Sequence, residues 1–227
     1  MRPGTSIAIE TSCRQGGLAL GLDDQLARVV AFDAASRHAT TLVARLKSLL
    51  EEAALRPTEL AELYVSIGPG SFTGVRVGVT VARTLAQVAP DLRCVAVPTA
   101  LAVAHRAAQM EWRHLAVILD ARGGGVHASL FARQGEEIVP AGEPMVATAE
   151  EFLAAAPRPL LLTGEGLDYH PITGPEITSV APAMRLPTAE CVWHVGRQMA
   201  AGGQFTDYRR LLPIYVRDPC FRAKQGL

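Results

Sequence analysis

A pattern that occurs twice limits the folds open to this sequence. Residues 7–22 (IAIETSCRQGGLALGL) and residues 117–131 (VILDARGGGVHASLF) each contain an apolar strand ending in an acidic residue, a glycine-containing turn and a second apolar strand. The two acidic residues, Glu10 and Asp120, lie 110 residues apart, which is the length of a small domain. Duplication of a β-meander domain is the simplest explanation, with chance as the alternative because glycine-rich β-turns are common.

The first half of the chain alternates between strand-like and helix-like periodicity. Short apolar segments predict strands at 6–10, 16–22, 25–32, 62–68 and 93–97. A period near 3.6 residues predicts helices at 38–53, 75–89 and 99–108. In the first of these helices, the apolar residues that share one face are Ala39, Leu42, Val43, Leu46, Leu49, Leu50 and Ala53.

The second half contains the repeated strand pair and further alternating elements. After residues 115–131 the pattern predicts a helix at 148–156, a strand at 158–166 and a helix at 188–201. Thr148 and Glu151 have the spacing of a capping box, and Thr188 is a second helix cap. The sequence thus predicts an α/β protein with two small lobes, residues 1–108 and 109–227. Whether the last helix packs back on the first lobe is left open.

Composition excludes several classes of protein. Hydrophobic residues make up 49% of the chain, too many for a disordered protein. The 22 basic residues balance 22 acidic residues, so the chain lacks the overall positive charge needed to hold a nucleic acid tightly on its own. The cysteines have no zinc or redox spacing; they are Cys13, Cys94, Cys191 and Cys220. Without a recognisable signal peptide or membrane-spanning run, a cytoplasmic protein is expected, with no membrane association.

Residues 68–74 (GPGSFTG) form a glycine-rich loop between a predicted strand and a predicted helix. Such a loop can direct backbone N–H groups and the positive end of a helix dipole at a phosphate. It lacks the Lys and Ser/Thr that follow the last glycine of a P-loop, and its spacing is not G-x-G-x-x-G. The alternative is a conformational role, in which Pro69 and the glycines shape the turn and Ser71 or Thr73 caps the helix.

The helix after this loop carries a small residue at every fourth position from Gly74 to Ala86. With its valines and leucine, its apolar surface covers roughly 200°, whereas about 100° is enough to pack on one sheet. This excess predicts an interface with a helix of a partner subunit, made by Gly74, Val75, Gly78, Val79, Ala82 and Ala86. The alternative is that a second helix of the same domain covers the excess.

Few residues have the spacing that catalysis requires. Glu10 and Asp120 resemble the strand-end acids that hold metals and nucleotides in actin-like enzymes, but two acids do not make a metal site. The six histidines form no His-x-x-x-His or His-Glu-x-x-His pair, and no serine or cysteine lies in a nucleophile-elbow motif. The sequence therefore yields no candidate catalytic residue, cofactor-binding residue or metal ligand.

Four segments together resemble the TsaB (YeaZ) family. They are SIAIETS at 6–12, GPGSFTGVRVG at 68–78, DARGGGVHASLF at 120–131 and LLPIYVRDP at 211–219. The match extends over nearly the whole chain, and GPGSFTGVRVG is its most specific element. The resemblance implies a duplicated actin-like ATPase (ribonuclease H-like) fold. One departure is Glu10-Thr11, where the family commonly has Asp-Thr, and this makes retained nucleotide chemistry less expected.

The resemblance also implies a function. Members of the family are paralogues of the catalytic subunit TsaD and pair with TsaD and the small ATPase TsaE. The complex transfers a threonylcarbamoyl group to N6 of adenosine 37 in tRNAs that read codons beginning with A. TsaD holds its metal through a His-x-x-x-His motif, which this sequence lacks. The implied role is a non-catalytic scaffold that uses no cofactor and meets tRNA only through the complex, with a homodimer open when TsaD is absent.

Two other functions stay open at this stage. A stand-alone actin-like ATP-dependent kinase or transferase would need metal-binding acids, and a glycoprotease-like peptidase would need a nucleophile or zinc ligands. The C-terminal tail has a local positive excess that fits a contact with tRNA or a partner, or simply a solvated tail. Its basic residues are Arg209, Arg210, Arg217, Arg222 and Lys224.

Overall fold

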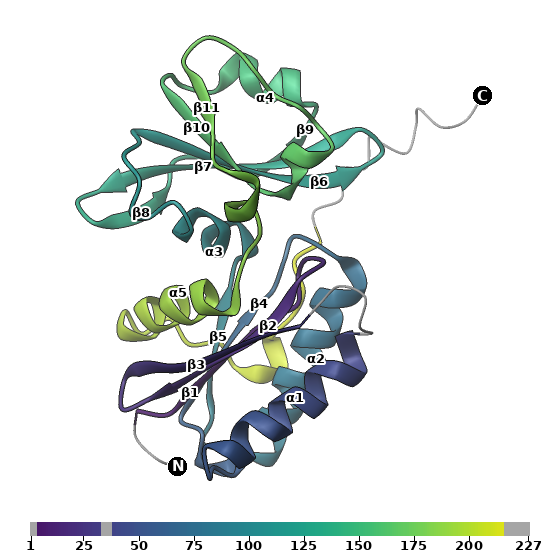
Figure 1. The fold of residues 1–227 in the computed structure, drawn as a ribbon, viewed down its shortest axis with the longest axis vertical. Coiled ribbons are helices and arrows are strands. Elements are labelled where there is room, and N and C mark those ends of the chain that lie inside the picture. The colour runs from purple at the N-terminus through teal and green to yellow at the C-terminus, as the bar shows by residue number, and fades with distance from the viewer. Residues whose placement is uncertain (1–3, 33–37, 216–227) are drawn as a thin grey trace. The chain divides into compact units, whose positions relative to one another are not determined.

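The first sheet of the computed structural model has five strands in the order β3-β2-β1-β4-β5 (Figure 1). In that order they span Gln25–Phe32, Gly16–Leu22, Ser6–Glu10, Glu62–Ser66 and Arg93–Val97. β1 pairs antiparallel with β2 and parallel with β4, which pairs parallel with β5. The structure describes residues 4–32 and 38–215, so Cys220 and the basic residues Arg217, Arg222 and Lys224 lie outside the described residues.

Helices cover both faces of this sheet (Figure 1). α1 (His38–Glu52) and α2 (Phe72–Val88) lie on one face, and α5 (Ala189–Ala201) lies on the other. Because successive strand residues point to opposite faces, Ile7 and Ile9 pack with the first two helices and Ala8 packs with α5. A Cβ at Gly196 would come within 2.4 Å of the Tyr64 ring, so glycine allows α5 to lie close to the sheet.

The second sheet has the same topology. Its main strands follow the order β11-β10-β6-β7-β8, and β9 (Met145–Ala147) pairs with β7 off this path. The main strands span Ile177–Ser179, Leu160–Thr163, His114–Arg122, Gly125–Gln134 and Glu137–Pro140. β6 is antiparallel to β7 and parallel to β10, as β1 is to β2 and β4. The repeated strand order confirms the predicted duplication and the two-copy α/β fold.

The chain forms two units, and each unit consists of two stretches that are separate in the sequence. The first comprises Met1–Ala102 and Pro187–Ile214, and the second comprises Val103–Leu186 and Tyr215–Leu227. α5 thus belongs to the first unit although it comes after most of the second in the chain. The predicted lobes, 1–108 and 109–227, divide the chain once, whereas the units divide it at three places, and α3 (Thr99–His105) contains the first of them.

Polar caps set the starts of several helices. α2 begins at Phe72, three residues before the predicted start, because the Ser71 side chain accepts a hydrogen bond from the Gly74 N–H at 3.2 Å. α4 (Ala149–Ala155) begins with the capping box predicted from Thr148 and Glu151, and Thr188 caps α5 as predicted. Within residues 4–32 and 38–215, no helix is long and apolar enough to cross a membrane.

The connections after β10 and β11 are short. A 3₁₀ helix, η2 (Glu165–Asp168), comes after β10, and a second, η3 (Pro182–Met184), comes after β11. In the first unit, η1 (Pro57–Glu59) precedes β4 and η4 (Tyr208–Arg210) comes after α5. The segments that come after β4 and after its counterpart β10 therefore differ, because β4 leads into the 17-residue helix α2 and β10 leads into η2.

Candidate functional site

Glu10, the acidic residue at the end of β1, contacts a residue two positions further along its own chain. Glu10 is fully buried, and its Oε1 accepts hydrogen bonds from the backbone N–H and the hydroxyl of Ser12, the latter at 2.6 Å. A buried carboxylate needs such donors, because water is not available to solvate it. Ser12 therefore fixes the direction of the first strand-end acid.

The GPGSFTG loop packs onto the same segment. The Ser71 N–H donates to the Ser12 carbonyl at 2.6 Å, and a Cβ at Gly70 would lie 2.3 Å from that oxygen. Gly68 is held by Thr99, whose hydroxyl accepts from the Gly68 N–H at 3.1 Å. These two loop N–H groups donate to protein oxygens. The Ser71 cap of α2 and the positive φ of Gly68 are features of the conformational alternative to a phosphate site.

The two glycines of the α2 stripe lie against Thr11, the residue that follows β1. The Thr11 hydroxyl donates to the Gly74 carbonyl at 2.8 Å. A Cβ at Gly74 would come 2.0 Å from the Thr11 carbonyl oxygen, and one at Gly78 would come 2.3 Å from its hydroxyl. All six residues of the sequence-predicted interface are buried inside the first unit: Gly74, Val75, Gly78, Val79, Ala82 and Ala86. At Gly74 and Gly78 the close approach is therefore to the chain just after β1, and the six residues are buried in the free chain.

The exposed side of α2 forms an apolar groove with α1. Its volume is about 400 Å³, and it is lined by Val43, Phe72, Thr73, Arg76, Val77, Thr80 and Val81. Val43 is 54% exposed and Phe72 is 44% exposed, so both helices present apolar surface to solvent at this groove. The Arg76 guanidinium lies over the Phe72 ring at 4.8 Å. We call these seven residues the α1–α2 groove.

The sequence analysis did not predict this groove, although it did identify the excess apolar surface of α2 that forms it. The helical face predicted for α1 included Val43 as a core residue, but Val43 lies at the edge of that face and stays exposed. The excess apolar arc of α2 contained Val77 and Val81, which the structure leaves partly buried beside the core. Because α1 covers only part of that arc, the remainder opens into the groove.

The strand-end acid of the second unit has a different partner. Asp120 Oδ1 lies 3.2 Å from Nε2 of His170, so the carboxylate orients the imidazole. His127, on β7, is largely buried, and burial lowers its pKa while the charge of Asp120 acts against that change. Among the residues that the structure describes, no three His, Cys, Asp or Glu side chains are placed to hold a metal ion.

Together the two copies define the chain as a duplicated ribonuclease H-like protein of the actin-like class. A family model described as "TsaD: tRNA N6-adenosine threonylcarbamoyltransferase" matches residues 29–196. The solved structure of YeaZ from Pseudomonas aeruginosa superposes with a TM-score of 0.82 at 24% identity, covering 94% of this chain and all of that one. This likeness shows the same fold.

Two further relatives are named tRNA threonylcarbamoyladenosine biosynthesis protein TsaB. The protein from Bacillus subtilis (strain 168) is 29% identical over 221 residues, 94% of each chain. That from Escherichia coli (strain K12) is 27% identical over 194 residues, covering 80% of this chain and 81% of its own. The chain belongs to the family described by the matching model, and its relatives are TsaB (YeaZ) proteins.

Proposed function

We propose that this chain takes part in the biosynthesis of threonylcarbamoyladenosine in tRNA, as a cytoplasmic, non-catalytic scaffold subunit that binds TsaD. The names of its relatives support the pathway. The observation that carries the scaffold role is the α1–α2 groove, because Val43 and Phe72 expose apolar surface that a partner would cover. The reaction is the modification of adenosine 37 in tRNAs that read codons beginning with A.

TsaD is the proposed occupant because it shares the family model that matches this chain. Two related units can pack helix against helix, with the ridges of one pair entering the grooves of the other. Phe72 provides an aromatic anchor, and Arg76 beside it provides a charged rim, as in protein interfaces generally. We further propose that TsaE joins this complex, that tRNA is met only through it, and that the same groove pairs two copies when TsaD is absent.

The geometry of β1 gives little support to a stand-alone kinase or transferase. The Oε1 of Glu10 is bonded to Ser12, and the loop that could cradle a phosphate is packed on the Ser12 carbonyl. Nucleotide binding would have to displace these contacts. The chain alone, supplied with tRNA, threonine, bicarbonate, ATP and the enzyme that makes the adenylate, is therefore expected to give no modified tRNA. Product formed without TsaD would overturn the scaffold proposal.

The groove is tested by placing a charge in it. Val43→Asp and Phe72→Asp are expected to weaken binding of purified TsaD at least tenfold in titration calorimetry, because an interface would bury an unpaired carboxylate. Both positions are exposed in the free chain, so thermal melting should stay close to that of the unmodified protein. Gln198→Asp, exposed on α5 on the other face of the sheet, is the matched control. Unchanged TsaD binding in both groove variants would remove the groove from the interface.

A further inference from the structure

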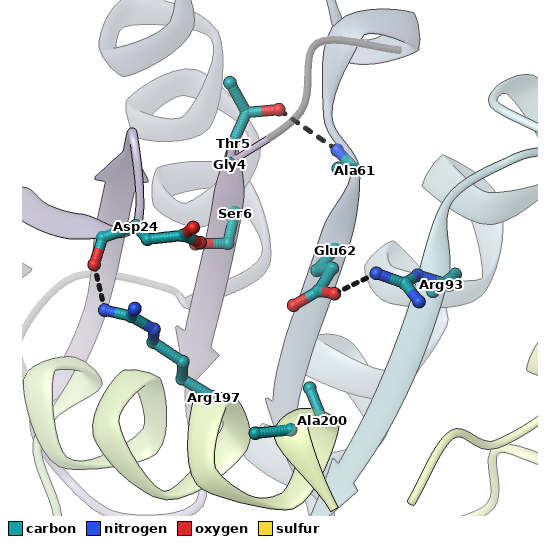
Figure 2. Close-up of a pocket in the computed structure, with 10 residues that line it drawn as sticks. Gly4, Thr5, Ser6, Asp24, Ala61, Glu62, Arg93, Arg197 and Ala200 are labelled. Atoms are coloured by element: carbon teal, nitrogen blue, oxygen red, sulfur yellow. Dashed lines mark hydrogen bonds and ion pairs between the residues drawn. The ribbon is translucent and has the colours of Figure 1, made fainter. Parts of the chain in front are cut away.

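A pocket of about 460 Å³ opens at the edge of the first sheet where β1, β4 and β5 begin (Figure 2). Its walls are the first residues of these strands, the turn between β2 and β3, and the last turn of α5. This edge is opposite the end of β1 that carries Glu10, and no step of the proposed function uses it. Figure 2 shows Arg93 and Arg197 extending toward it from different sides.

One wall is a closed ion pair. Nη2 of Arg93 contacts Oε1 of Glu62, its register partner on the neighbouring strand, and the Tyr64 hydroxyl donates to Oε2. The Arg93 guanidinium also lies 4.4 Å from the centre of the Phe205 ring. The charges of Arg93 and Glu62 cancel, so this pair supplies a polar wall with little net charge.

The other wall holds two opposite charges that do not pair with each other. Nη1 of Arg197 donates to the backbone carbonyl of Asp24, and its guanidinium lies 5.4 Å from the centre of the Trp193 ring. Trp193 is fixed in turn because its Nε1 donates to the Ser6 hydroxyl at 2.9 Å. Since Arg197 bonds the carbonyl, the Asp24 carboxylate remains separate, and Figure 2 shows it directed toward Ser6.

Arg197 is one of the residues that line the pocket, and it brings a positive charge to that wall. A guanidinium has five N–H donors in a planar fork that matches a carboxylate. The contact with Asp24 uses Nη1, which leaves further donors for a ligand.

The opposite charge comes from the Asp24 carboxylate. The last turn of α5 also lines the pocket, with Ala200 and Ala201, but the carbonyls of residues 198–200 already accept hydrogen bonds from residues 202–204. A simple anion would therefore meet Arg197 on one side and repulsion on the other. A ligand with adjacent positive and negative groups matches both.

The second unit shows that the fold does not require this charged edge. In the first unit Ser6, Glu62 and Arg93 lie in one register across β1, β4 and β5. By the correspondence of Glu10 with Asp120, the matching row in the second unit consists of Ala116, Leu162 and Ser179. The same strand order thus carries no charged side chain in that row, so the charged row belongs to the first unit and not to the topology.

We propose that this pocket binds a small zwitterion of the α-amino acid type, with its carboxylate on Arg197 and its ammonium group at Asp24. The arrangement fits because Arg197 and Asp24, which are in contact, line one cavity with opposite charges. The carboxylate and ammonium groups of an amino acid are likewise close together, on one carbon. The ion pair of Glu62 and Arg93 forms the wall along which the ligand side chain lies.

The full chain is titrated with L-alanine, L-threonine and L-glutamate, and binding is measured by amide chemical shifts and calorimetry at constant ionic strength. Saturable binding is expected for at least one amino acid, with acetate and methylammonium, which carry one charge each, at least tenfold weaker. Acetate binding as tightly as the best amino acid would overturn the zwitterion proposal, and so would the absence of saturable binding by all three.

Matched variants locate the site. Asp24→Asn and Arg197→Gln should each weaken amino acid binding at least tenfold, whereas Asp23→Asn, in the same turn but not in the pocket wall, should leave it unchanged. Asn is suitable because it tolerates the positive φ of 61° at residue 24. Equal effects of the Asp23 and Asp24 variants would contradict the proposal. Because the α1–α2 groove is untouched, TsaD binding by these variants should not change, which separates this test from that of the proposed function.

Discussion

Glu10 ends β1 and Asp120 lies near the end of β6, the equivalent strand of the second copy, yet their surroundings differ. Glu10 is fully buried and is bonded to Ser12, two residues further along the chain. Asp120 is partly exposed and contacts His170, which is 50 residues away. The strand order has been kept in both copies because backbone hydrogen bonds fix it, whereas the polar groups at the strand end have diverged.

The two units also differ in the element that comes after β4 and after its counterpart β10. In both, a glycine of that segment passes close to a backbone carbonyl, in the residues just after β1 in the first unit and within β6 in the second. A Cβ at Gly70 would come 2.3 Å from the Ser12 carbonyl, and one at Gly164 would come 2.1 Å from the Ile118 carbonyl. After that crossing the first unit builds α2, and the second builds only the four-residue η2. The two-helix groove proposed to bind TsaD is therefore a property of the first unit.

The largest expected effect is in the second unit. Gly164→Ala combines a positive φ of 105° with a Cβ 2.1 Å from the Ile118 carbonyl oxygen, so we expect a loss of about 3 to 4 kcal/mol in the free energy of unfolding. Urea unfolding measures the loss, and hydrogen exchange should place it in β6 and β10. Gly123→Ala has a positive φ of 64° but no atom within 4 Å of its Cβ, and it should cost about 1 kcal/mol. Equal losses would show that the close crossing is unimportant.

The corresponding test in the first unit enlarges the small residues of α2. Ala82 is fully buried in the core, so Ala82→Leu should lower the free energy of unfolding by about 1 to 3 kcal/mol through overpacking. Thr84→Leu, exposed on the same helix, is the control and should stay within about 0.5 kcal/mol. If Ala82→Leu kept full stability and lost only TsaD binding, the helix–helix seam first predicted from the sequence would be restored.

Removing a helix cap should reduce stability less, and by a similar amount in the two units. Thr188→Ala removes the cap of α5 in the first unit, and Thr148→Ala removes that of α4 in the second. Each should cost about 1 kcal/mol, and serine at either position should restore most of it. Thermal melting of the four variants measures this. A markedly larger cost at Thr188 would show that the first unit depends more on its helix than the second does.

The smallest expected effect is a pH dependence of stability that arises in the second unit. His127 corresponds in register to Leu18 of the first unit, and burial lowers its pKa, so the folded state favours the neutral imidazole. Stability is then fully present above the ordinary histidine pKa of about 6.5 and declines as the pH falls below it. Asp120 opposes this, which keeps the effect small. His127→Leu should reduce the loss measured by urea unfolding between pH 7.5 and pH 5.5, and an unchanged slope would assign the loss to other groups.

The sequence predicted the helices and strands better than the tertiary contacts between them. The Thr148 and Thr188 caps depend on residues a few positions away, so local spacing was sufficient to find them. The orientation of the α2 stripe could not be predicted, because small residues permit close approach without saying whether Thr11 or another helix approaches. The amino-acid pocket could not be found either. It needs Arg197 beside Asp24, and that contact joins residues 173 positions apart.

The return of α5 to the first unit affects the order in which the protein can fold during synthesis. When Ala102 leaves the ribosome, the sheet face that contains Ala8 and Tyr64 has been made, but the helix that covers it ends only at Ala201. At translation rates of about 5 to 20 residues per second, that apolar face waits roughly 5 to 20 s for its cover. Exposed apolar surface of this kind is what makes a nascent chain prone to aggregation and in need of chaperones. Residues 103–186 of the second unit are made during the wait.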